Sequence, residues 1–226
     1  MLPLEGPVGF SRAMYVDWKI RVASECSMAR ANGWRTCWAA MRRVRGSLFV
    51  DYVKMVRSMK KVDWTQYLEP ADQRFIDEPV DLTGWYPMET FERLGVGILG
   101  EVARGQLEAV RMWGRFQVDA LRLHLPDLVA EGDPRDTLYR FQTLRRGMFD
   151  YDAVDIAHAD DEQAKIRIAY GMGVKAEEAA AHQARGFFER LLEIAGATDI
   201  SSRFLETSWT GAPTTTIELA WAPRSG

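Results

Sequence analysis

The spacing of apolar residues divides the chain into a helical first part and a mixed second part. From residue 47 to residue 149, apolar side chains recur every three or four positions, as they do on the buried face of a helix. This spacing predicts helices from Ser47, from Pro87, across residues 101–129 and over Thr137–Phe149. The first half is therefore predicted to be almost entirely helical.

The period of the pattern changes after residue 160. Lys165–Tyr170 alternates polar or small residues with apolar ones, which indicates a half-buried strand. Ala176–Ala195 is an amphipathic helix that stops at Gly196. Arg203–Thr210 and Thr214–Trp221 are predicted to be two antiparallel strands joined by a turn. The order predicts an α+β fold, in which a helical half leads into a small antiparallel sheet with an amphipathic helix packed on it.

Residues 1–40 differ from the rest of the chain. They begin with loop chemistry and continue with three tryptophans that follow no amphipathic order. We interpret 1–40 as a poorly ordered appendage and 41–222 as a single domain. Met28 and Met41 offer alternative translation starts, and in that case the first residues would not belong to the native protein.

Composition and charge exclude several classes of protein. The chain has 226 residues, 47% of them hydrophobic, and a net charge of −3, so no general attraction to nucleic acid is expected. No segment approaches the about 20 apolar residues that span a bilayer, and the first residues do not have the pattern of a secretory leader. We expect a cytoplasmic protein in which Cys26 and Cys37 are unpaired thiols.

No catalytic or metal-binding signature stands out. The three histidines, His124, His158 and His182, lack the spacing of metal ligands. The acidic segment 155–162 is interpreted as a solvated turn, and the glycines of 95–100 as a junction between helices rather than a phosphate loop. With no nucleophile or acid–base pair in view, we expect a protein that is not an enzyme.

Four short motifs occur in the same order as in one known family. They are Trp85-Tyr86-Pro87-Met88-Glu89, Gly114-Arg115-Phe116-Gln117-Val118, Leu138-Tyr139-Arg140-Phe141, and Ile168-Ala169-Tyr170 followed by the helix with Gly186-Phe187-Phe188. Together they resemble the haem-dependent nitric-oxide/oxygen-binding (H-NOX) domain and, in the second half, the 4-vinyl-reductase-type small-molecule-binding domains. From Val44 to Trp221 the chain is most similar to an uncharacterised paralogous family of myxobacteria, from which no activity can be carried over.

The resemblance also implies that the haem ligands are gone. It puts Tyr139 where the H-NOX family has its iron-binding histidine. Of the family's tyrosine–x–serine–x–arginine motif, which holds the haem propionates, only Tyr170 is kept; Met172 and Val174 replace the serine and the arginine. We therefore expect no cofactor. The alternative is a haem-binding gas sensor in which a Tyr139 tyrosinate ligates the iron.

In the resembled fold, six aromatic residues would converge on a ligand pocket between the helices and the sheet: Trp113, Phe116, Tyr139, Phe141, Tyr170 and Phe187. The other interpretation is that they simply fill the core. The predicted function is a haem-free bacterial sensor or adaptor that binds a small apolar molecule or a signalling protein. The alternative is a structural interaction module, dimeric through exposed helices or the edge of the strand Thr214–Trp221.

Overall fold

The computed structural model describes residues 42–222, so the predictions for residues 1–40, including both cysteines, lie outside the described part. Within it, the first elements are β1 (Arg43–Arg45), α3 (Gly46–Ser58), α4 (Gln73–Asp77), β2 (Trp85–Pro87) and α5 (Met88–Glu101). The helices predicted from Ser47 and Pro87 are confirmed, each shifted by one residue. Pro87 caps α5 instead of opening it. The antiparallel pairing of β1 with β2 was not predicted, because three-residue strands leave no periodic signal.

The middle of the chain forms α6 (Leu107–His124) and α7 (Pro134–Leu144). Asp133 caps α7 by accepting a 2.8 Å hydrogen bond from the Asp136 amide. Pro126 follows the end of α6, where its ring cannot continue a helix. The predicted long helix over 101–129 is thus confirmed in its central part.

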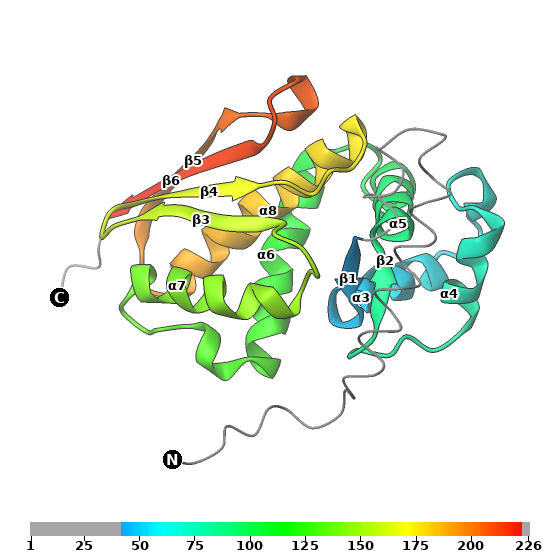
Figure 1. Ribbon diagram of the computed structural model, residues 1–226, viewed down its shortest axis with the longest axis horizontal. Helices are drawn as coiled ribbons and strands as arrows, with labels where there is room; N and C mark the ends of the chain where they lie inside the picture. Colours follow the sequence, from blue (N-terminus) through cyan, green and yellow to red (C-terminus); the bar gives the residue numbers. More distant parts are fainter. Residues whose placement is uncertain (1–41, 223–226) are drawn as a thin grey trace, which may run out of the picture. The chain divides into compact units, whose positions relative to one another are not determined.

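The last part forms a four-stranded antiparallel sheet and one long helix (Figure 1). Its elements are β3 (Val154–Ala159), β4 (Gln163–Ile168), α8 (Val174–Ile194), β5 (Thr198–Glu206) and β6 (Thr215–Ala222), and the strand order is β3-β4-β6-β5. Helix α8 and the pairing of β5 with β6 confirm the predicted α+β arrangement. None of the described helices is both long and apolar enough to cross a bilayer.

Two interpretations of local sequence were wrong. The acidic segment 155–162 is mostly strand β3, whose Val154 and Ile156 pair with apolar residues of β4. A bulge between Ile156 and His158 breaks the alternation that would have revealed it. The glycines of 95–100 lie inside α5 rather than at a helix junction. A Cβ on Gly97 would lie 2.9 Å from the Trp64 ring, so this glycine lets an aromatic ring pack closely on the helix.

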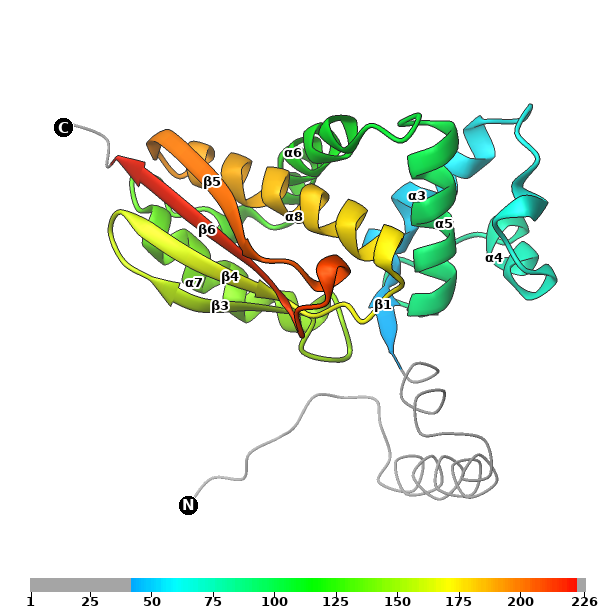
Figure 2. The ribbon, with the colours of Figure 1, turned by 90° about the horizontal axis from the view of Figure 1, so that it is seen from above.

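Helix α8 lies between the four-stranded sheet and α6 (Figure 2). The two helices cross at Gly114 and Gly186. A Cβ on either would lie 1.9 Å from a backbone carbonyl oxygen of the other helix, so only glycine permits this approach. Beside the crossing, Arg111 and Arg115 of α6 form ion pairs of 2.7 Å with Glu189 and Glu193 of α8.

The buried side chains form two main clusters. One joins α6, α7 and α8 to the sheet and contains Phe141 and Phe188. The other joins α3, α5 and the short strands and contains Phe49, which stacks on Tyr86 at 4.4 Å between ring centroids. Leu48, Phe149 and Tyr170 contact both clusters. The candidate site lies along this boundary.

Candidate functional site

A cavity of about 540 Å³ lies between the two clusters. That volume falls within the range of about 300–1,000 Å³ that is usual for small-molecule sites. Helix α3 supplies one wall, α6 and α8 another, and α7 and β3 a third. The aromatic residues of the lining are Tyr52, Phe91, Phe141, Phe149, Tyr170, Phe187 and Phe188.

Three of the six predicted pocket residues, Phe141, Tyr170 and Phe187, line this cavity together. Phe141 lies against Phe187 at 5.4 Å between ring centroids, so α7 and α8 present a continuous aromatic wall. A fourth, Trp113, lines a separate cavity of about 30 Å³ on the other side of Tyr52, whose ring lies 4.9 Å away.

The prediction for Tyr139 was wrong. Its side chain is 45% exposed, and its hydroxyl lies 3.4 Å from the carbonyl oxygen of Ala159 instead of in the cavity. The reason is the helical repeat: Leu138 and Phe141 form the buried face of α7, and Tyr139 is two residues from Phe141, a rotation of about 200°. In the segment that resembles the haem-ligand motif, the residue that faces the cavity is therefore Phe141 and not Tyr139.

The prediction for Phe116 was also wrong. Its side chain is 65% exposed on the outer face of α6. On this helix Gln117 and Leu121 face the cavity, and Gly114 faces α8. Phe116 lies on the remaining side, which no other described element covers.

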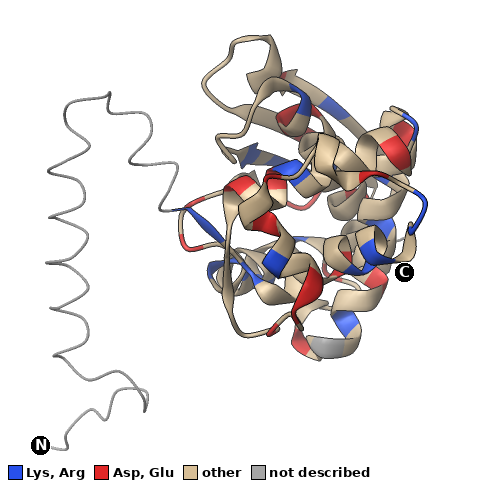
Figure 3. Ribbon diagram, turned by 90° about the vertical axis from the view of Figure 1, so that its right-hand side faces the viewer, with Lys and Arg blue, Asp and Glu red and all other residues tan. Residues whose placement is uncertain are grey.

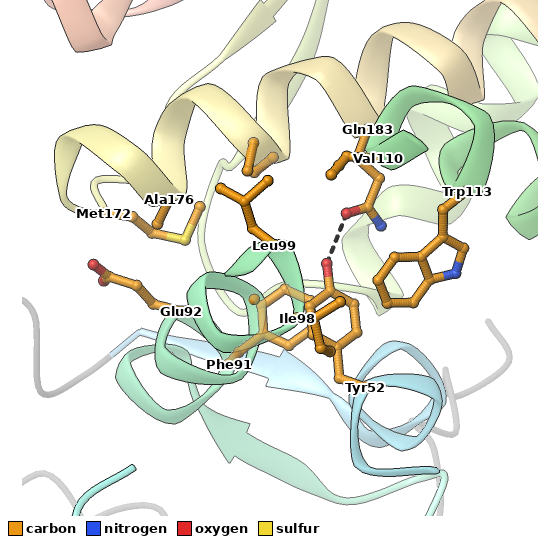
Figure 4. A pocket seen from close by; sticks show the side chains of 13 residues that line it. Tyr52, Phe91, Glu92, Ile98, Leu99, Val110, Trp113, Met172, Ala176 and Gln183 are labelled. Carbon is orange, nitrogen blue, oxygen red and sulfur yellow. Dashed lines mark hydrogen bonds between the residues drawn. The ribbon is translucent and has the colours of Figure 1, made fainter. Parts of the chain in front are cut away.

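A hydrogen-bonded chain of three polar side chains crosses the cavity wall. The Tyr52 hydroxyl donates to Gln183 Oε1 over 2.7 Å, and Gln183 Nε2 donates to Gln117 Oε1 over 2.7 Å. Figure 4 shows the Tyr52 hydroxyl pointing at the Gln183 side chain from the opposite helix. Gln117 Nε2 has no hydrogen-bond acceptor among the described residues, so its donors face the cavity unused. The sequence signal for this chain was polar residues on otherwise apolar helix faces.

Tyr170 brings a second polar group to the cavity. Its backbone carbonyl accepts hydrogen bonds from Arg42 Nη1 at 2.8 Å and from the Tyr151 hydroxyl at 3.2 Å, which fix the residue between β4 and α8. Gly171 follows with φ of +69°, a conformation that favours glycine. The Tyr170 hydroxyl itself makes no hydrogen bond within the described residues.

Both cavity tyrosines are held in the protonated form. Burial raises the pKa of Tyr52 above its ordinary value by more than its hydrogen bond to Gln183 lowers it. Burial also raises the pKa of Tyr170, and the neighbouring Tyr151 adds to the effect. Each phenol is therefore a neutral hydrogen-bonding group across the physiological pH range.

Charge is confined to the rim of the cavity. Asp51 and Lys54 are the charged residues of the described lining, and they pair with each other at 3.5 Å on the exposed side of α3. In the view of Figure 3, acidic and basic residues are interspersed along the described chain. The interior of the cavity is thus apolar, aromatic and neutral.

The described lining of the cavity lacks the side chains that most often ligate haem iron, although it contains Met88, Met148 and Met172. Its described lining contains neither histidine nor cysteine, and Phe141 brings no metal-binding atom from α7. Ligation by a tyrosinate would require a lowered pKa, whereas the pKa values of Tyr52 and Tyr170 are raised. Nor do the described histidines and carboxylates form a group that could hold a metal ion.

Searches for related sequences found no matching family model and no similar curated protein. Solved structures do match. An H-NOX protein from S. oneidensis in the Fe(II)NO ligation state is 11% identical, with a TM-score of 0.53 over 79% of this chain and 99% of that one.

Two further structures give the same result. The unliganded Fe(II) H-NOX protein from K. algicida is 11% identical, with a TM-score of 0.55 over 79% of this chain and 96% of that one. A mutant of T. tengcongensis H-NOX is 10% identical, with a TM-score of 0.53 over 80% of this chain and 100% of that one. The described chain is therefore similar to H-NOX proteins in its α+β fold, as its sequence motifs predicted.

Proposed function

We propose that this domain is a non-enzymatic, haem-free sensor or adaptor whose cavity binds a small, neutral, largely apolar molecule. The observation that carries the proposal is the aromatic cavity of about 540 Å³ between the two hydrophobic clusters. Apolar walls with a few placed polar groups are the usual chemistry of small-molecule sites. The lack of histidine and cysteine in the described lining supports binding without haem.

The charge distribution favours a neutral ligand. A charged group inside the cavity would lose its hydration, and no described interior side chain carries a charge to compensate. Lys54, the cation at the rim, is already paired with Asp51. A carboxylate or an amine would therefore bind only at the mouth.

The free polar groups favour a ligand with a hydrogen-bond acceptor, such as a ketone, an aldehyde or an amide. The Gln117 amide nitrogen and the Tyr170 hydroxyl are both donors that no described residue satisfies. A ligand carbonyl in the cavity would accept a hydrogen bond from either donor.

A sensing role follows from where the cavity lies. A ligand there contacts α3 and α5 on one side and α6, α7 and α8 on the other. Binding that favours one packing of these helices over another would shift the population of the two arrangements. The fold of H-NOX proteins supports this role by analogy alone.

Three fluorescent naphthalenes test the proposal. Prodan is a neutral aromatic ketone, dimethylaminonaphthalene lacks the ketone, and dimethylaminonaphthoate carries a carboxylate instead. We expect Prodan to bind with a blue-shifted emission and to raise the melting temperature. The compound without the ketone should bind about 10-fold more weakly, since one hydrogen bond is lost, and the carboxylate should bind least.

Variants separate the polar groups from the cavity itself. Gln117→Leu and Tyr170→Phe should each weaken Prodan binding about 3- to 10-fold and leave dimethylaminonaphthalene unaffected. Gln73→Leu, a substitution on the exposed part of α4, is the matched control. If none of the three dyes binds, the cavity is not a ligand site. If all bind equally, ligand binding stands and the preference for an acceptor is wrong.

A further inference from the structure

Helix α6 carries an apolar stripe on the side that faces away from α8. Met112, Phe116 and Leu123 are 41%, 65% and 78% exposed, and their spacing of four and seven residues puts them on one face of the helix. Ala109 and Ala120 are exposed beside them. Large apolar side chains in such a row mark an interaction surface more often than scattered exposed residues do.

Two copies of this stripe are complementary to each other when their helices run antiparallel. In an antiparallel pair centred on Phe116, Leu123 lies opposite Ala109, because each is seven residues from the centre. Met112 likewise lies opposite Ala120, and the two Phe116 rings meet at the centre. Each large side chain thus faces a small one, which is the pattern that lets two helices interlock.

The charged residues along one edge of the stripe are also complementary to their own copies in an antiparallel pair. Glu108, Arg111, Asp119 and Arg122 alternate so that reversal puts Glu108 near Arg122 and Arg111 near Asp119. Each pair is offset by two residues, about 3 Å along the helix, which these long side chains span. In a parallel two-fold pair this edge would instead face the opposite edge of the partner helix, so these four charges would not meet one another. Within the chain Glu108 already pairs with Arg111 at 2.8 Å and Asp119 with Arg190 at 3.1 Å, whereas Arg122 is exposed and makes no ion pair with any described residue.

We propose that two copies of this chain associate through α6, with the helices antiparallel about a two-fold axis at Phe116. In such an isologous interface every contact occurs twice, so the apolar and charged complementarity both count double. The stripe also borders the ligand cavity, because Ala120 belongs to its lining. The inference depends on the surface of α6 alone and stands whether or not the cavity binds a ligand.

Light scattering after size-exclusion chromatography of the full chain tests the proposal. We expect the mass of two chains, and we expect Phe116→Glu to give the mass of one chain with an unchanged circular dichroism spectrum. Leu205→Glu is the matched control, because Leu205 is 42% exposed on β5, outside the stripe, and should leave the dimer intact. A wild-type mass of one chain, or a Phe116→Glu variant that remains dimeric, would overturn the proposal.

Charge reversal tests the register and separates self-association from capture of another protein. Arg122→Glu and Glu108→Arg should each raise the dimer dissociation constant about 10-fold, because each creates two repulsive pairs. The double variant restores opposite charges across the axis and should recover most of the lost affinity. If both single variants weaken the dimer and the double variant weakens it further, the antiparallel register is wrong.

Discussion

At the scale of the residue, two positions on α7 show which side of this helix faces the cavity. Phe141 is buried in the cavity wall, and Tyr139 points outward. Histidine at the two positions should therefore have different effects. We expect Phe141→His to shift the Soret band of added haem, because it brings an imidazole to the cavity. Tyr139→His and the wild type should leave the spectrum of added haem unchanged.

Absorbance titrations with haem at matched protein concentrations make this comparison. A Soret shift with the wild-type protein would show that some other side chain ligates the iron, and would contradict the haem-free proposal. An equal shift for the two histidine variants would instead show surface binding.

The sequence predicted the residue types of the cavity better than their positions. Phe141, Tyr170 and Phe187 reach it, but Phe116 and Tyr139 belong to helix faces that point to solvent. An aromatic residue fits either side of an amphipathic helix when its neighbours are also apolar, so periodicity alone did not choose the face. The chain of Tyr52, Gln183 and Gln117 joins three helices, so the polar residue on one helix face could not by itself reveal its two partners.

At the scale of the element, the crossing of α6 and α8 depends on two glycines. We expect Gly114→Ala and Gly186→Ala each to destabilise the protein by about 1–3 kcal/mol, because the added methyl group would overlap a backbone carbonyl of the other helix. Urea denaturation followed by circular dichroism measures the effect. Gly147→Ala is the control, since nothing lies within 4 Å of a Cβ there, and its stability should change by less than about 0.5 kcal/mol.

A neutral result at Gly114 or Gly186 would show that the helices can separate without loss, and the close crossing would not then be a structural requirement.

The individual helices and strands also show how much of the fold the sequence could predict. Long amphipathic helices and the hairpin were found because each has its own periodic signal. Strand β3 was missed because its bulge and its acidic residues hide the alternation. Strands β1 and β2 depend on pairing with partners far along the chain, because β1 pairs with β2 and Val44 of β1 also bridges to Phe149.

At the scale of the whole molecule, the cavity forms only when the chain folds, because it lies where two separate hydrophobic clusters meet.

Ion pairs on both sides of that boundary predict how stability depends on pH. Burial opposes ionisation of Asp72, but hydrogen bonds from Arg93 and Thr90 outweigh it and hold the pKa of Asp72 below its ordinary value. Burial is likewise outweighed at Glu193, where Arg115 and Arg190 lower the pKa.

A carboxyl group whose pKa is lower in the folded state contributes stability above its unfolded pKa, and that contribution is lost as the pH falls through the folded value. The free energy of unfolding should therefore fall steeply below about pH 4, where unfolded aspartate and glutamate begin to bind protons.

Asp72→Asn should lower stability at pH 7 by about 1–3 kcal/mol, because Arg93 loses a charged hydrogen-bond partner. It should also flatten the acid slope, whereas Asp77→Asn, at an exposed carboxylate of α4, should change neither. Urea denaturation at a series of pH values measures both effects. If the slope of Asp72→Asn equals that of the wild type, the acid sensitivity arises from other carboxylates, and the pairing of Asp72 with Arg93 does not control it.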